Sequence, residues 1–180
     1  MTYKLFYADD SAAMAPRVLL EEIGAEYALI DTTIDQGKPR DPAHLALNPN
    51  GWVPVLAWDG GAMYEASAIA IYLTDLYPQA GLGPAASHPD RALFLQTLVY
   101  FSNTLQTVFQ QHYYPLRFAS DAQDAKACGA RRLRHVWQVI DEQLAGCDWV
   151  VGGRFSAADV QLFMLTTWLE PDAGHPDVAD

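Results

Sequence analysis

The sequence predicts two parts of different fold class, an α/β part followed by an all-helical part. In the first 76 residues, short apolar segments of strand length alternate with segments of helical composition. After Pro89, apolar residues recur at helical spacing. Between the two parts, segment 78–89 holds three prolines and two glycines, a composition typical of a linker.

The first elements alternate between strand and helix. Segment 3–7 is apolar and aromatic, which indicates a short buried strand. Segment 12–23 has helical composition and is followed by Gly24, where a glycine commonly ends a helix. Segment 27–31 is predicted as a second strand, and 36–47 is polar and contains proline, so we expect a loop with a little helix.

A hairpin and a helix complete the α/β part. Strands are predicted over 54–58 and 62–64, and the intervening Asp59-Gly60-Gly61 is a strong hairpin signal. A helix is predicted over 67–76. The order β-α-β-(α)-β-β-α resembles a thioredoxin fold, with a parallel pair first and an antiparallel hairpin last.

The second part is predicted to be helical throughout. The predicted helices cover 90–111, 121–144 and 160–169. Breaks between them are predicted at Tyr113-Tyr114-Pro115 and Gly152-Gly153. Ser156 and Asp159 form a variant of the capping box that opens the last helix. The predicted architecture is therefore an α/β thioredoxin-like domain over 1–78, a linker over 79–88 and an all-α domain over 89–180.

Composition excludes several classes of protein. A net charge of −11 argues against a nucleic-acid binder and against an anionic membrane surface. No apolar run approaches the roughly 20 residues that span a bilayer, and the N-terminus lacks the pattern of a secretory signal. Cys128 and Cys147 indicate free thiols in a reducing compartment, which predicts a cytoplasmic protein. The five scattered histidines have no metal-ligand spacing, so no metal site is predicted.

The stretch from Asn48 to Ile69 carries the chemistry. A proline-started strand at Val53-Pro54 offers main-chain groups that cannot join a central ladder. Glu65 and the N–H groups that follow it, at the start of a helix, can meet an ammonium and a carboxylate together. Such an arrangement can hold a small peptide by its backbone and its charged ends.

Five motifs occur in one order over nearly the whole chain. They are Lys4-Leu5-Phe6-Tyr7, Ala15-Pro16-Arg17, the segment 48–56, Glu65-Ala66-Ser67-Ala68-Ile69 with Tyr72-Leu73, and Phe155-Ser156 with Asp159. In this order and spacing the chain resembles a cytosolic glutathione transferase of bacterial type, close to the beta and theta groups. Such enzymes ionise the sulfur of glutathione, and the thiolate then attacks an electrophile.

The resemblance implies roles for individual residues. Val53 would exchange backbone hydrogen bonds with the cysteinyl part of glutathione, with Pro54 in the cis form. Glu65 would take the γ-glutamyl ammonium, and the N–H of Ala66 or Ser67 the γ-glutamyl carboxylate. Lys38 is the candidate for the glycyl carboxylate.

The catalytic position departs from the bacterial pattern. Members of that group carry a cysteine where this chain has Ala12. Ser11 lies one residue earlier, where serine-type members place their hydroxyl, and it is the favoured thiolate contact; a helix cap is the alternative role for it. Tyr7 is the second candidate, and a site of backbone groups alone is the third. The family often has serine directly after the acid, where this chain has Ala66.

The helical part is expected to supply the pocket for the electrophile. Phe109, Tyr113, Tyr114 and Arg117 are the predicted lining, and packing of aromatic side chains at a helix break is the alternative. Family members usually continue with one or two more helices, so the sequence, which stops at Asp180, is expected to lack them.

The predicted function is transfer of glutathione, as co-substrate, to a small hydrophobic electrophile, in detoxification. A homodimer is implied by the resemblance. Alternatives of the same fold are a glutathione-dependent isomerase, reductase or dehalogenase, and a non-catalytic glutathione-binding protein.

Overall fold

The computed structural model describes residues 2–35 and 37–169. The chain divides into two compact units after Arg91. The predicted linker, 79–88, belongs to the first unit.

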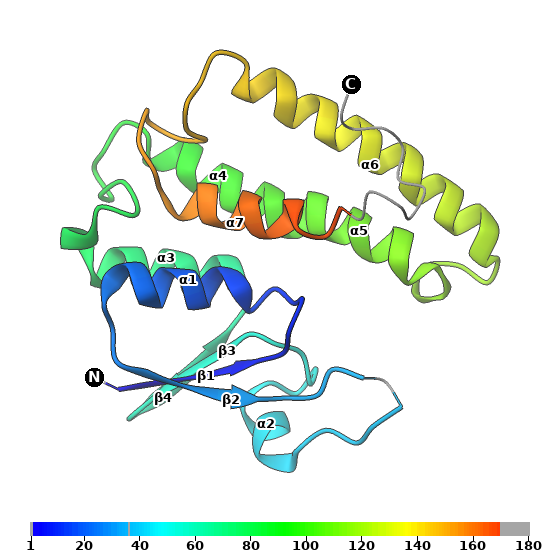
Figure 1. The fold of residues 1–180 in the computed structure, drawn as a ribbon, viewed down its shortest axis with the longest axis horizontal. Helices are drawn as coiled ribbons and strands as arrows, with labels where there is room; N and C mark the ends of the chain where they lie inside the picture. The colour runs from blue at the N-terminus through cyan, green and yellow to red at the C-terminus, as the bar shows by residue number, and fades with distance from the viewer. Residues whose placement is uncertain (1, 36, 170–180) are drawn as a thin grey trace. The chain divides into compact units, whose positions relative to one another are not determined.

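The first unit is a four-stranded sheet with helices (Figure 1). Its elements are β1 Tyr3–Tyr7, α1 Met14–Ile23, β2 Tyr27–Asp31, α2 Pro42–Leu47, β3 Val55–Trp58, β4 Gly61–Tyr64, α3 Ala66–Leu76 and the 3-10 helix η1 Pro78–Ala80. The strand order is β2-β1-β3-β4. β1 and β2 are parallel, and the β1–β3 and β3–β4 pairs are antiparallel. The predicted thioredoxin-like α/β fold is confirmed.

The two faces of this sheet have different partners. Helices α1 and α3 lie together on one face, and α2 lies on the other (Figure 1). Successive side chains of a strand alternate between faces. Tyr3 and Leu5 of β1 are fully buried, and the Tyr3 hydroxyl lies 3.1 Å from that of Tyr77, just after α3. Phe6 faces the other way and stacks on His44 of α2, with ring centroids 5.5 Å apart.

The second unit is helical, as predicted. Its elements are α4 Arg91–Tyr100, the π-helical turn η2 Phe101–Leu105, α5 Gln106–Tyr113, the 3-10 helix η3 Pro115–Arg117, α6 Ala122–Leu144 and α7 Ala157–Thr166. The predicted single helix over 90–111 thus contains a π-helical turn. The Ser102 hydroxyl in that turn donates to the carbonyl of Leu98 at 3.0 Å, and side-chain bonds of this kind loosen the regular helix.

Packing and capping fix the helices of the second unit. Gly129 of α6 lies against the backbone of α5, because a Cβ at this position would be 3.0 Å from the amide nitrogen of His112. The predicted capping box at α7 is confirmed: Asp159 accepts from the N–H of Ser156 at 2.8 Å and from the N–H of Val150 at 2.9 Å. Asp159 therefore ties the preceding loop to the first turn of α7.

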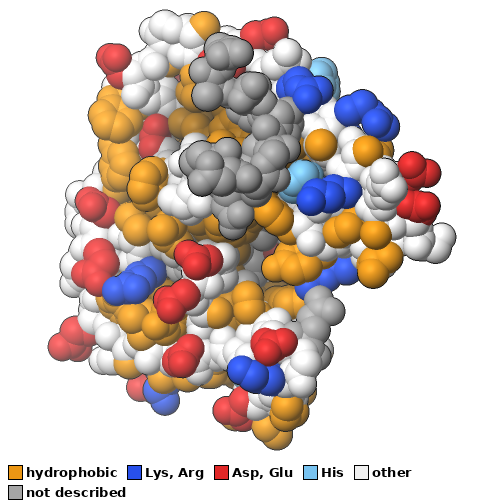
Figure 2. Space-filling model, turned by 45° about the vertical axis from the view of Figure 1, so that its right-hand side comes forward, with side chains coloured by type: hydrophobic (Ala, Val, Ile, Leu, Met, Phe, Trp, Pro, Cys, Tyr) orange, Lys and Arg blue, Asp and Glu red, His pale blue; other side chains and the backbone are white. Residues whose placement is uncertain are grey.

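Hydrophobic, acidic and basic side chains are mixed on the face of the molecule that Figure 2 shows. No helix within residues 2–35 and 37–169 is long and apolar enough to cross a membrane. Over the same residues, no group of three or more His, Cys, Asp or Glu side chains could hold a metal ion.

Candidate functional site

Glu65 joins β4 to α3 in a backbone conformation that is rare for a side-chain-bearing residue. Its φ is 76° and its ψ is 110°. The side chain is exposed, and it makes no capping hydrogen bond to the helix that it precedes. The first turn of any helix directs N–H groups out of its end. An exposed carboxylate is therefore carried by the residue that directly precedes the N–H donors at the start of α3.

The segment from Asn48 to Pro54 consists of a turn and a bend that lead into β3. The Val53–Pro54 bond is cis, as the resemblance implied. Gly51 has a φ of +67°, and a Cβ there would lie 3.0 Å from the Cγ of Arg40. This position therefore favours glycine by conformation and by space.

The carbonyl of Trp52 is held from two directions within this turn. The Nδ2 of Asn48 donates to it at 2.8 Å, and the Nε2 of His44 lies 3.1 Å from it. Asn48 also accepts from the N–H of Asn50 through its Oδ1, at 3.1 Å. Both side chains are buried. The main chain directly before Val53 is thus fixed by side-chain contacts.

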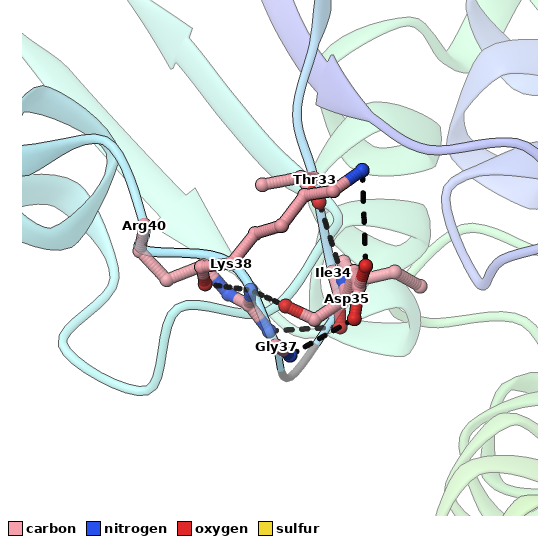
Figure 3. Close-up of polar contacts among 6 residues, drawn as sticks. All are labelled: Thr33, Ile34, Asp35, Gly37, Lys38 and Arg40. Atoms are coloured by element: carbon pink, nitrogen blue, oxygen red, sulfur yellow. Dashed lines mark hydrogen bonds and ion pairs between the residues drawn. The ribbon is translucent and has the colours of Figure 1, made fainter.

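Arg40 fastens the loop after β2 to this turn. Its guanidinium donates to four carbonyls: those of Gly51 at 2.9 Å, Asp35 at 2.6 Å, Ile34 at 2.8 Å and Lys38 at 3.3 Å. Figure 3 shows the guanidinium pointing into the loop, where the carbonyls of the loop converge on it. The planar donor group of arginine suits several acceptors at once.

Lys38 projects from this loop with its ammonium near Asp35. The Nζ lies 3.7 Å from the Asp35 carboxylate, and the side chains are 68% and 55% exposed (Figure 3). An exposed pair of this kind contributes little, about 0–1 kcal/mol. A carboxylate ligand that reached this loop could therefore replace Asp35 as the partner of Lys38.

Ser11 lies in the turn that enters α1. Its hydroxyl donates to the carbonyl of Ala8 at 2.6 Å and accepts from the N–H of Ala13 at 3.2 Å. The residue is buried, and α1 begins at Met14 rather than at the predicted Ala12. To donate to a sulfur atom, the hydroxyl would have to turn away from Ala8. The helix cap weighed for Ser11 is not observed, because Ala13 is the N-cap residue of α1 and no side chain caps this helix. The Ser11 hydroxyl instead braces the turn that precedes α1.

Tyr7 and Ala12 flank this turn. Tyr7 ends β1 and is partly buried; its carbonyl accepts from the N–H of Thr32 at 2.8 Å. Ala12 is buried, so the position that carries a cysteine in the bacterial group holds a methyl group against the core. Ser11 is the hydroxyl nearest to it in the sequence.

Comparison with known proteins assigns the chain to a family. The family model of the glutathione S-transferase N-terminal domain matches residues 1–75, and that of the C-terminal domain matches residues 95–176. The structure of a sphingomonad glutathione S-transferase complexed with glutathione is 30% identical, with a TM-score of 0.79 over 92% of this chain and 81% of that one. The chain belongs to the glutathione S-transferase family.

Bacterial relatives support the same assignment. Glutathione S-transferase GstA of Escherichia coli O157:H7 is 29% identical over 92% of this chain and 81% of its own length. A glutathione transferase structure from Methylococcus capsulatus is 27% identical, with a TM-score of 0.81. A bacterial beta class glutathione S-transferase from Sphingomonas chungbukensis is also 27% identical, with a TM-score of 0.80. The protein is thus a glutathione S-transferase with beta-like relatives.

The four residues predicted to line the electrophile pocket of this transferase form two pairs within the second unit. Phe109 is buried and lies parallel to the ring of Tyr113, with ring centroids 6.3 Å apart. The Tyr113 hydroxyl donates to the carbonyl of Trp168 at 2.6 Å. Tyr114 is exposed, and the Arg117 guanidinium lies 4.0 Å from its ring centroid. The first pair is part of the helix packing, whereas the second lies at the surface.

Sequence reasoning assigned no side-chain role to three residues that hold the main chain of the candidate site: Arg40, His44 and Asn48. His44 lies on α2, and Asn48, four residues later, is the C-cap residue of that helix in an extended conformation. That spacing, directly before a turn, was the available signal. The role of Arg40 had no comparable signal, because its acceptors are main-chain carbonyls.

Proposed function

We propose that this transferase binds glutathione along Val53-Pro54 and the start of α3, and activates its sulfur for attack on a small hydrophobic electrophile. The observation that carries the proposal is Glu65. Its carboxylate is exposed, is not used to cap α3, and stands in a backbone conformation that costs about 1–3 kcal/mol. Strain of this kind in a family member points to a ligand-binding role.

The tripeptide would be held at both ends. Glu65 would bind the γ-glutamyl ammonium, and the N–H of Ala66 or Ser67 the γ-glutamyl carboxylate. Val53 would pair with the cysteinyl main chain through its N–H and C=O. Lys38 would bind the glycyl carboxylate, in exchange for its exposed pair with Asp35. Charge-assisted hydrogen bonds at both ends would supply most of the affinity.

The thiolate is proposed to form near the turn that enters α1. Ser11 is the favoured donor to the sulfur; Tyr7 is the second candidate, and backbone N–H groups are the third. The positive end of α1 favours the thiolate by about 0.3–1 kcal/mol. Rotation of the Ser11 hydroxyl away from Ala8 would supply one further hydrogen bond.

The transfer step is a displacement or an addition. With an aryl halide, the thiol proton leaves to solvent, the thiolate sulfur forms the bond to carbon, and the halide departs with the bonding electrons. Phe109, Tyr113, Tyr114 and Arg117 are proposed to line the pocket of the electrophile. The exposed Tyr114–Arg117 pair is the part of this set that is open to a ligand.

Association into a homodimer, in the cytoplasm, is part of the proposal. Several large hydrophobic side chains are exposed on described residues. They include Leu76, Leu93, Val99, Leu116 and Phe163. Association of two copies would bury side chains of this kind, and a homodimer is the assembly that the family resemblance implies. Sedimentation equilibrium at micromolar concentration measures the oligomeric state directly.

The test of binding is calorimetry with reduced glutathione and with the dipeptide Cys-Gly, which lacks the γ-glutamyl group. Glutathione should bind, and the dipeptide should bind at least about tenfold more weakly, since it loses contacts to charged groups. In Glu65→Gln this preference should shrink, whereas in the exposed control Glu22→Gln it should persist. The absence of heat with millimolar glutathione would refute the proposal.

The test of chemistry follows glutathione during turnover. Conjugation of an aryl halide consumes one glutathione per halide released. An isomerase returns glutathione unchanged, and a reductase yields its disulfide. Halide release without an aryl conjugate would favour the dehalogenase alternative. Binding without any turnover would favour a non-catalytic role.

A further inference from the structure

We propose that His44 is a positioning residue that aims the main chain of Val53 at glutathione. The inference rests on the proposed function, because it concerns the segment that would bind the cysteinyl part. His44 lies on α2, on the sheet face opposite α1 and α3 (Figure 1). It is fully buried.

The geometry of the peptide unit links His44 to Val53. The Nε2 of His44 lies 3.1 Å from the carbonyl oxygen of Trp52. A carbonyl only accepts hydrogen bonds, so Nε2 carries the proton at this contact. The carbonyl of Trp52 and the N–H of Val53 belong to one planar trans peptide unit and point in opposite directions. A group that fixes the first therefore fixes the direction of the second.

Packing against Phe6 makes His44 a rigid donor. Its ring stacks on Phe6 of β1 at 5.5 Å between centroids, with an interplanar angle of 11°. Its Nδ1 is buried without a hydrogen-bond partner among the described residues. The ring is thus held by packing and by one hydrogen bond. The buried Nδ1 without a hydrogen bond lowers the stability of the folded protein, and a phenylalanine at this position would remove that cost.

Asn48 alone leaves the peptide unit free to rotate. Its Nδ2 holds the Trp52 carbonyl at 2.8 Å, and one hydrogen bond allows rotation about its own axis. A second donor, His44, which lies one turn before Asn48 in α2, limits this rotation. The combined action of His44 and Asn48 therefore pre-organises the N–H of Val53, so that less entropy is lost when a ligand binds.

The experiment compares two variants that separate ring from donor. His44→Phe keeps the ring against Phe6 and loses the donor; His44→Gln loses the ring and keeps an N–H donor of similar reach. His135→Phe, at an exposed position of α6, is the matched control. Glutathione affinity is measured by calorimetry, and the free energy of unfolding by urea titration.

We expect His44→Phe to bind glutathione about three- to tenfold more weakly, the equivalent of one hydrogen bond, without a loss of stability. His44→Gln should be less stable yet should bind within about twofold of the wild type. Unchanged glutathione affinity in His44→Phe would overturn the inference. The inference would also fail if, in both variants, the loss of affinity were proportional to the loss in the free energy of unfolding.

A second readout does not depend on glutathione. In ¹⁵N-labelled wild-type protein, the His44 ring should show a slowly exchanging Nε2–H, and hydrogen exchange of the Val53 amide should be faster in His44→Phe than in the wild type. Equal exchange in the two proteins would overturn the inference. If the wild type bound no glutathione while these exchange differences appeared, the proposed function would fail and the positioning of Val53 by His44 would stand.

Discussion

The Nε of Arg40 donates a hydrogen bond to the carbonyl of Gly51 across eleven residues of sequence, at 2.9 Å. Three further bonds from the same guanidinium reach carbonyls of the loop after β2. One side chain thus holds the loop that carries Lys38 against the turn that carries Val53. The spacing between these two predicted ligands of glutathione depends on Arg40.

Replacement of Arg40 by lysine should therefore affect both stability and binding. Lysine keeps the charge but cannot reach several carbonyls at once. We expect the free energy of unfolding to fall by about 1–3 kcal/mol and glutathione affinity to fall as well. Urea unfolding and calorimetry measure the two effects. Arg131→Lys, on the exposed side of α6, should change neither; a loss of stability there equal to that of Arg40→Lys would contradict the prediction.

Glu65→Gly should separate stability from binding. Glycine adopts a positive φ more readily than glutamate, which offsets the entropy that glycine loses on folding. The variant should be at least as stable as the wild type in thermal unfolding, and its glutathione affinity should fall by at least about tenfold with the loss of the carboxylate. A destabilisation of more than about 1 kcal/mol would show that the backbone of Glu65 is not strained.

Ser11→Ala tests the proposed thiolate contact. The substitution should raise the pKa of the sulfur of bound glutathione and slow turnover, because a donor to the thiolate is lost. Tyr7→Phe should have little effect on either quantity. The measurement is a pH titration of the thiolate absorbance of the bound tripeptide. Equal titration curves for the wild type and both variants would exclude Ser11 and leave the backbone as the source of activation.

Alkaline pH should weaken the first unit through Tyr3. Burial, and then the hydrogen bond with Tyr77, raise the pKa of Tyr3 well above its usual range. Above pH about 10, tyrosine in the unfolded chain loses its proton while folded Tyr3 keeps it. The folded state then binds more protons, so its free energy of unfolding falls as the pH rises. The contribution of Tyr3 to the free energy of unfolding is therefore fully present below pH about 10 and is lost as the pH rises further.

The variant Tyr3→Phe should accordingly show a shallower decline in the free energy of unfolding between pH about 10 and 11.5. The difference in slope should approach 1.4 kcal/mol per pH unit at most, the value for one proton. Burial also raises the pKa of Tyr27 and of Tyr100, so part of the decline should remain in the variant. Identical slopes in wild type and variant would disprove the role of Tyr3.

Local signals sufficed for most of the fold. The hairpin at Asp59-Gly60, the strand that follows Pro54 and the capping box of Ser156 and Asp159 each depend on neighbouring residues, and each was predicted from them. The π-helical turn at Phe101–Leu105 was missed. Its residues have ordinary helical composition. Bonds from a hydroxyl to a preceding carbonyl, such as the one that Ser102 makes, also occur in the regular helices α3 and α7, so they did not set this turn apart.

By itself, the sequence determined the order of the strands and helices and the family to which the chain belongs, because these follow from hydrophobic period, turn chemistry and motif spacing. The tertiary structure alone decided the direction of the Ser11 hydroxyl, the backbone conformation of Glu65 and the joint contact of His44 and Asn48 with the Trp52 carbonyl. The first depends on which backbone groups the turn before α1 brings within about 3 Å of the hydroxyl. The second depends on how the chain turns from β4 into α3. The third depends on how the end of α2 and the turn after it aim two donors at one carbonyl, which lies only four and eight residues further along the chain. The spacing of the residues indicates that such a contact is possible, and the folded backbone decides whether it forms.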